Sequence, residues 1–294
     1  MTTTTSTSST EPKVPLAVWP CAQVTAQYQR AGRYLPESTR HPGKMLPDLA
    51  RRIVEAFSGP GDLVVDPMAG SGTTLVEAAS LGRRTIGVEL EPRWVALARA
   101  NIDYVPDADQ RRLAEVRAGD ASRLVEVLDD VAGRVDLVVL SPPYACEVAA
   151  IDKPAWRSGR RLADPTTKNY SANERNLGHA RGDVYVDAMA EVYAGIHRLL
   201  RPGGLLATVT KNLHRQGRLL DLAAMTHDLA TRSGLCYLQH IVALHAAIRD
   251  DTLVPRPSFW QLTRVRRDRD RDQPAHLVAH EDVLVFRKED PVDG

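Results

Sequence analysis

The sequence is poor in the residues and patterns that mark several large protein classes. Its 294 residues contain only three cysteines, which excludes a disulfide scaffold and offers no CxxC metal knuckle. No apolar run reaches about 18 residues, so we expect no membrane-spanning segment. The first ten residues, mostly Thr and Ser, lack the basic and apolar regions of a secretory signal. These absences predict a cytoplasmic protein.

An excess of positive charge is also missing. The chain has 38 Lys and Arg against 37 Asp and Glu, whereas proteins that bind nucleic acids usually present a basic surface. The balance is uneven, however. Residues 153–181 contain seven basic and two acidic residues, and residues 26–54 contain six and two. Net charge therefore does not exclude a nucleic-acid partner, and it predicts salt-sensitive binding.

From about residue 46, short apolar runs alternate with helical patterns, which is typical of a doubly wound α/β sheet. The predicted strands are 63–66, 85–89, 114–117, 136–140, 205–210, 237–244 and 282–287. The predicted helices are 47–57, 73–81, 92–102, 122–130, 184–200 and 219–233. We expect residues 1–13 to be a disordered tail and residues 14–288 to form one domain. Two irregular inserts, at about 145–182 and 246–277, are the expected substrate-side elements, because long irregular segments in compact domains are usually functional or disordered.

A glycine turn follows the first predicted strand of this pattern. Asp66-Pro67-Met68-Ala69-Gly70-Ser71-Gly72-Thr73 leads from the strand into a helix, and its glycines allow close approach of a ligand. No Lys follows Gly72, so this is not a phosphate-binding P-loop. The next two strands end near Glu89 and Asp120, and an acidic residue at a strand end is placed to bind a ribose diol. The pattern predicts a nucleoside-binding site.

The stretch DPMAGSGTT, with GVELEP after it, resembles the S-adenosylmethionine motif of amino-methyltransferases that act on nucleic-acid bases. The upstream segment His41-Pro42-Gly43-Lys44 is similar to the family segment that closes over the methionine end of the cofactor. The resemblance implies that Asp66 and the backbone of 69–72 face the methionine moiety, that Glu89 holds the ribose, and that Asp120 holds the adenine amino group. It covers roughly residues 14–288 and implies the Rossmann-like fold of class I methyltransferases, with a seven-stranded, mostly parallel sheet and an antiparallel hairpin at 237–287. The cofactor-binding residues we predict are Lys44, Asp66, Ala69, Gly70, Ser71, Gly72, Thr73, Glu89 and Asp120.

Ser141-Pro142-Pro143-Tyr144 follows the fourth predicted strand and is the predicted catalytic motif. Two prolines make this turn stiff. An exocyclic amine is a poor nucleophile because its lone pair is delocalised into the ring. The Ser141 hydroxyl and the Pro142 carbonyl can accept its two hydrogens and free the lone pair, while Tyr144 offers a surface on which a flipped base can stack.

In the resembling family the Ser form of this tetrad is commonest among enzymes that make N4-methylcytosine, which favours cytosine N4, then adenine N6, in DNA. The cofactor motif precedes the tetrad here, whereas many Ser-type enzymes have the reverse order. That order leaves open an RNA methyltransferase acting on guanine N2 of transfer RNA. A non-catalytic S-adenosylmethionine-binding regulatory module is the alternative of another class, and the intact Ser141 and Tyr144 speak against it.

Other chemistries have little support in the sequence. A cytosine C5-methyltransferase needs a Pro-Cys nucleophile after the fourth strand, and the only Pro-Cys pair is Pro20-Cys21. The histidines have no metal-binding spacing, so no metal is expected. Lys211, Asn212 and Arg215, after the fifth predicted strand, are the candidate substrate-binding residues, as phosphate contacts or as a solvated polar loop.

Overall fold

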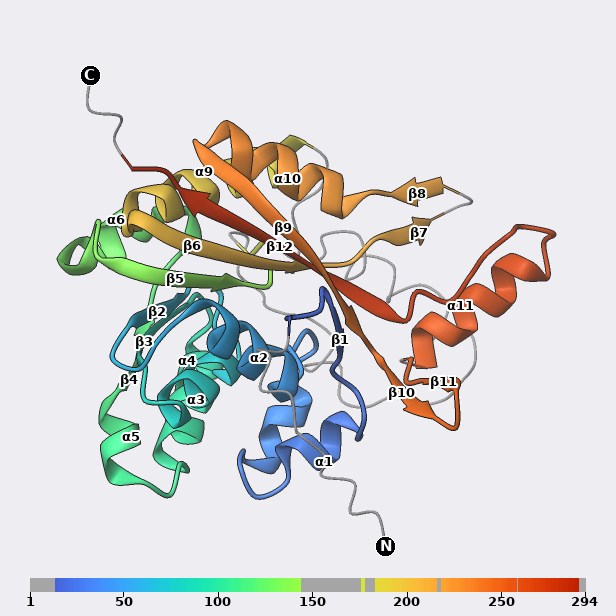
Figure 1. Cartoon of the computed structure of the whole chain (residues 1–294), viewed down its shortest axis with the longest axis horizontal. Helices are drawn as coiled ribbons and strands as arrows, with labels where there is room; N and C mark the ends of the chain where they lie inside the picture. The colour runs from blue at the N-terminus through green and yellow to red at the C-terminus, as the bar shows by residue number, and fades with distance from the viewer. Residues whose placement is uncertain (1–13, 144–175, 178–182, 216–217, 258, 291–294) are drawn as a thin grey trace, which may run out of the picture.

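The computed structural model describes residues 14–143, 176–177, 183–215, 218–257 and 259–290. An eight-stranded sheet runs through them, with helices on both faces (Figure 1). In pairing order its strands are β1 (Val18–Pro20), β9 (Leu235–Leu244), β12 (His280–Lys288), β6 (Leu200–Thr210), β5 (Val135–Leu140), β2 (Leu63–Asp66), β3 (Arg84–Glu89) and β4 (Ala114–Ala118). Within this sheet β12 is antiparallel to both of its neighbours, and the remaining pairs are parallel.

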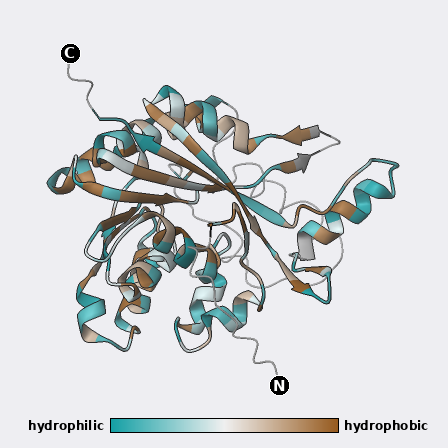
Figure 2. Ribbon diagram, viewed as in Figure 1, coloured by the Kyte–Doolittle hydropathy of each residue, from teal (hydrophilic) through white to brown (hydrophobic). Residues whose placement is uncertain are grey.

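Helices cover the sheet because its inner strands are apolar on both faces. Successive side chains of a strand point to opposite sides, so Val64, Leu137 and Val139 pack under α2, whereas Val65 and Val138 pack under α9. Strands β2 and β5 are brown over most of their length in Figure 2, and α11 is mainly teal. The helices are α1 (Ala26–Arg30), α2 (Pro47–Phe57), α3 (Thr73–Ser80), α4 (Pro92–Asp103), α5 (Ala108–Arg112), α6 (Leu124–Val127), α9 (Asp183–Leu199), α10 (Leu222–Arg232) and α11 (Phe259–Arg269).

The strand order places a crevice at the middle of the sheet. The central strand β2 pairs with β3 on one side and with β5 on the other. Ligands of open α/β sheets bind beyond the carboxyl ends of the strands at such a reversal. The loops that follow β2 and β5 are the glycine turn and the Ser-Pro-Pro segment, so the topology brings the two predicted motifs to the same edge.

The predicted Rossmann-like fold is confirmed, and all seven predicted strands are present, including the antiparallel pair β9 and β12. The predicted count of seven is wrong by one strand, because β1 adds to the edge of β9. β1 has three residues and ends in Pro20, so it carries no local strand signal. The predicted helix 122–130 is instead α6 flanked by two 3-10 turns, η2 (Ala121–Arg123) and η3 (Asp129–Val131), and Leu128 between them leaves the helical conformation.

The second insert is more regular than the sequence suggests. It contains a hairpin of β10 (Ala246–Arg249) and β11 (Thr252–Pro255), followed by α11. Asp250 and Asp251 form the turn with φ of 44° and 63°, the left-handed geometry that two-residue hairpin turns require. The predicted polar loop after β6 is likewise a short ribbon of β7 (Leu213–Arg215) and β8 (Arg218–Leu220). Most of the first insert, and residues 1–13, lie outside the described residues.

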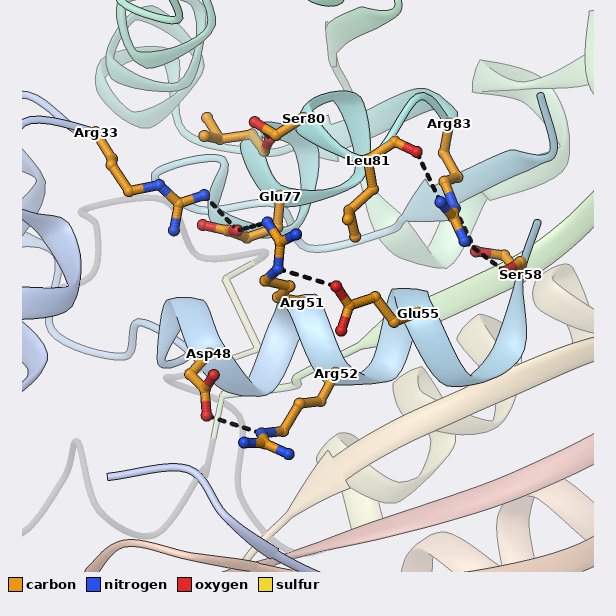
Figure 3. A network of polar contacts seen from close by, with 11 residues as sticks. Arg33, Asp48, Arg51, Arg52, Glu55, Ser58, Glu77, Ser80, Leu81 and Arg83 are labelled. Atoms are coloured by element: carbon orange, nitrogen blue, oxygen red, sulfur yellow. Dashed lines mark hydrogen bonds and ion pairs between the residues drawn. The ribbon is translucent and has the colours of Figure 1, made fainter. Parts of the chain in front are cut away.

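Several charges of the basic segment 26–54 make contacts within the protein. Glu77 of α3 is fully buried and accepts a hydrogen bond from Arg33 (2.6 Å), with Arg51 4.0 Å away (Figure 3). Tyr34 also donates to Glu77 (2.5 Å). Arg30 is buried and donates to the Met45 carbonyl and to Thr73. Arg52 pairs with Asp48 within α2. Arg30 and Arg33 therefore attach the segment before α2 to α3, the helix that follows the glycine turn.

Candidate functional site

A cavity of about 470 Å³ lies along the carboxyl edge of the sheet. Cavities of this size accommodate small ligands and cofactors. Following the strand order, its wall includes Asp120 after β4, Glu89 at the end of β3, Gly70 after β2, Ser141 after β5 and Lys211 after β6. The cavity thus joins residues from each predicted group, and the next paragraphs describe them in that order.

The glycine turn is shaped by its glycines. Gly70 and Gly72 have φ of 52° and 79°, in the left-handed region that glycine adopts without strain. A Cβ on Gly70 would lie 2.9 Å from Nε2 of His41, so only glycine fits between that ring and the cavity. Gly70 lines the cavity. The other predicted cofactor residues of this turn do not line it, namely Asp66, Ala69, Ser71, Gly72 and Thr73.

Glu89 ties the turn to the next strand end and remains able to accept hydrogen bonds. Its Oε2 accepts from the Gly70 amide (2.8 Å) and its Oε1 from the Glu91 amide (2.9 Å). Each carboxylate oxygen has two acceptor positions, so each keeps one for a ribose hydroxyl. Burial raises the pKa of Glu89 to about 7, against the lowering effect of those two amides. Burial likewise raises the pKa of Asp66 to about 6.

Asp120 completes the acidic side of the cavity. Its Oδ1 accepts from the Ser122 amide (3.0 Å) and hydroxyl (2.8 Å), which fixes the carboxyl group at the end of β4. The second oxygen, Oδ2, accepts no hydrogen bond within the part of the chain that the structure describes, and it suits an adenine amino donor. Together with the glycine turn, these acceptors fit a nucleoside cofactor bound across β2, β3 and β4.

The segment before α2 closes over this region. His41 is buried and packs edge-on against Trp94, with the ring centroids 4.7 Å apart. Burial, with nearby Lys44 and Arg30, lowers the pKa of His41 to about 3, so its imidazole is neutral. Lys44 lines the cavity, and its ammonium donates to the carbonyls of Thr39 (3.0 Å) and His41 (2.9 Å). A cation here suits the carboxylate end of an amino-acid tail.

The predicted catalytic motif is part of the cavity wall. Ser141, Pro142 and Pro143 line it, and Tyr185 of α9 donates a hydrogen bond of 3.1 Å to the Pro143 carbonyl. That contact fixes the turn at Pro143. Tyr144 lies outside the described residues.

The structure describes the side-chain surroundings of two of the three predicted substrate residues. Lys211 lines the cavity, whereas Asn212 accepts from the Ala223 amide (3.0 Å) at the start of α10. Arg215 ends β7. The roles of all three stay predictions.

Sequence reasoning missed several residues of the cavity wall. They are Glu91, Trp94, His245, Arg256, Gln261 and Glu281. Glu91 belongs to the GVELEP stretch but was given no role, and Trp94 follows that stretch. The other four lie in the second insert or next to it, which was the one signal for them. Asn176 donates to Glu91 with a distance of 3.0 Å. In the described ranges no three His, Cys, Asp or Glu side chains are grouped to hold a metal ion, and no helix there could cross a membrane.

Comparison with known proteins extends this picture. A family model described as DNA methylase matches residues 2–100, and one described as conserved hypothetical protein 95 matches residues 52–155. The chain is 35% identical over 125 residues to the DNA adenine methyltransferase YhdJ of Escherichia coli K12, which is 40% of each protein. It is also 35% identical over 111 residues to a tRNA (guanine(10)-N2)-dimethyltransferase of Methanocaldococcus jannaschii, covering 37% of this chain and 31% of that protein.

The chain therefore aligns with less than half of the length of these curated relatives. Among solved structures it is similar to the cyclase SpnF, with a TM-score of 0.50 and 13% identity over 84% of this chain and 82% of that one. At that identity the likeness concerns the fold alone. The DNA methylase match contains both the glycine turn and Glu89, so this part of the chain is similar to methyltransferases that use S-adenosylmethionine.

Proposed function

We propose that this chain transfers the methyl group of S-adenosylmethionine to an exocyclic amine of a DNA base, at cytosine N4 first and adenine N6 second. The observation that carries the proposal is the continuity of one cavity from Gly70 and Glu89 to Ser141 and Pro142. A cofactor held by the first pair and an amine held by the second would lie in the same cavity. In this proposal the reaction takes place in the cytoplasm, and the target base is flipped out of the DNA helix into the cavity.

The residues of the cavity divide the work. The cofactor supplies an electrophilic methyl group on a sulfonium. Glu89 and Asp120 hold its nucleoside, and Lys44 holds its charged tail. The Ser141 hydroxyl and the Pro142 carbonyl accept the two amine hydrogens, which draws the nitrogen lone pair out of conjugation and towards the methyl group. Positioning is the main catalytic effect, because the displacement is a single in-line step. Tyr144 stacks on the base, as the sequence predicts.

The sequence similarity to DNA adenine methyltransferase YhdJ supports DNA as the substrate, and the DNA methylase model supports it as well. The similarity to tRNA (guanine(10)-N2)-dimethyltransferase supports a second candidate, the same chemistry at guanine N2 of transfer RNA. Both candidates use the same cofactor and the same motif, so the acceptor nucleoside distinguishes them.

The deciding experiment gives the purified chain S-adenosylmethionine with a labelled methyl group, together with duplex DNA, single-stranded DNA or transfer RNA. Mass spectrometry of the digested nucleosides then identifies the product, and we expect N4-methylcytosine or N6-methyladenine in DNA. Label found in transfer RNA alone would refute the DNA proposal.

Ser141→Ala tests the polarising role. Loss of a hydrogen bond to the reacting amine should lower the methyl-transfer rate about 10- to 100-fold, with cofactor affinity within twofold of wild type. The control is Ser233→Ala at the end of α10, which removes a hydroxyl bonded to the Ala230 carbonyl far from the cavity. A full transfer rate in Ser141→Ala would show that the hydroxyl does not polarise the amine.

A further inference from the structure

The half of the cavity beyond the catalytic motif has a wall of its own. In sheet order the predicted nucleoside-binding residues follow β4, β3 and β2, and the motif follows β5. The strand ends beyond it add Lys211 after β6, Glu281 of β12 and His245 after β9, next to Arg256, Pro257 and Gln261 of the second insert. A methyl group moves from cofactor to acceptor across the motif. If the cofactor occupies the side of β2 to β4, the acceptor must occupy the side of β6, β12 and β9.

Three charged or polar side chains meet on that side because of the strand register. Thr210 of β6 is paired with Asp282 of β12, and Leu244 of β9 is paired with His280. Glu281 of β12 therefore lies between the residues that immediately follow the ends of β6 and β9, namely Lys211 and His245. All three line the cavity. Figure 1 shows β10, β11 and α11 beyond this end of β9 and β12.

Glu281 and His245 form a fixed pair. Nε2 of His245 lies 3.0 Å from Oε2 of Glu281. The backbone of His245 is held on both sides, since its amide donates to Ala279 (2.8 Å) and its carbonyl accepts from Arg256 (2.9 Å).

The positive groups around Glu281 favour its ionised form. Burial would raise the pKa of its carboxyl group, but the charge and hydrogen bond of His245, with Lys211 and His280, lower that pKa below its usual range. Lys211 brings an ammonium donor to the same cavity wall.

We propose that Lys211, on the same cavity wall as the Glu281–His245 pair, donates to the ring nitrogen next to the acceptor amine and so orients the base. This inference rests on the proposed function. In cytosine and adenine the ring atom beside the exocyclic amine, N3 or N1, is a hydrogen-bond acceptor, and an ammonium is a donor that matches it. The contact therefore fits cytosine N4 and adenine N6, the two acceptors of the proposed function.

The test is a double-mutant cycle between the protein and the base. The wild type's own methylation site is first located by sequencing methylated DNA. Oligonucleotides are then made with the natural target base or with its deaza analogue, 3-deazacytosine or 1-deazaadenine, which lacks the ring acceptor. Lys211→Met is measured on both, with Lys288→Met as matched control, because Lys288 lies at the other end of β12 and donates to the Leu200 carbonyl.

We expect Lys211→Met to lower kcat/KM on the natural base about 10- to 100-fold and to leave the deaza substrate within twofold of wild type. The affinity for S-adenosylmethionine and the thermal midpoint should change little, which separates a base contact from a folding defect. Equal losses on the natural and deaza bases would overturn the inference and leave the proposed function intact. Methylation of guanine N2 by the wild type, or no methylation of DNA at all, would overturn both.

Discussion

The pKa of Glu89 makes cofactor binding depend on pH, and the size of the effect can be worked out. Burial raises this pKa to about 7, with nearby Glu91 and Asp66 adding to the increase. A carboxylate that accepts two ribose hydroxyls binds better than a protonated carboxyl group. With a pKa of about 7, roughly one tenth of the side chain is ionised at pH 6 and roughly nine tenths at pH 8. The dissociation constant should therefore fall about tenfold between these pH values and level off above pH 8.

The assay is calorimetric titration of ligand from pH 5.5 to 8.5. S-adenosylmethionine has an α-amino group that titrates near pH 8, so the decisive ligand is 5′-methylthioadenosine, which has the ribose and adenine without the amino-acid tail. Glu89→Gln should bind about 100-fold more weakly at pH 8, because it loses two charge-assisted hydrogen bonds, and its affinity should not vary with pH. A flat profile in the wild type, or the same slope in Glu89→Gln, would refute the assignment of Glu89 to the ribose.

Two further predictions concern the scaffold of the site. Gly70→Ala should weaken S-adenosylmethionine binding at least tenfold by calorimetry, because its Cβ would meet His41. The control is Gly82→Ala, which has a similar positive φ with open space around it and should lose only about 1–2 kcal/mol of folding free energy to conformational strain. Equal affinity for the cofactor in the two variants would contradict this prediction. Tyr34→Phe should lower the free energy of unfolding by about 1–3 kcal/mol in denaturant titration, because buried Glu77 loses a hydrogen bond. The control is Tyr28→Phe, at an exposed position, which should leave the stability unchanged. A Tyr34→Phe protein as stable as the control would contradict the importance of that bond.

The parts of the fold that could be predicted from the sequence are those specified by neighbouring residues. Apolar runs such as 63–66 and 135–140 need burial on both faces, which only an inner parallel strand provides, and Pro47 and Pro92 each begin a helix in the structure as their fixed φ suggests. β1 could not be predicted, because its pairing with Val242–Leu244 depends on a partner more than 200 residues away. The contacts of Arg33 and Arg51 could not be predicted for the same reason, since Glu77 lies outside their segment.

The residues of the candidate site likewise fall into two groups, those in contiguous motifs and those brought together from distant parts of the chain. The glycine turn and Ser141-Pro142-Pro143 are contiguous motifs, because a turn that must approach a ligand closely has to be built from consecutive residues. The opposite wall has no such constraint. Lys211, His245 and Glu281 come from three strand ends and meet only through the register of β6, β12 and β9. A side chain that recognises a base can come from any strand that reaches the crevice, so substrate selectivity can change by single substitutions while the cofactor motif stays the same.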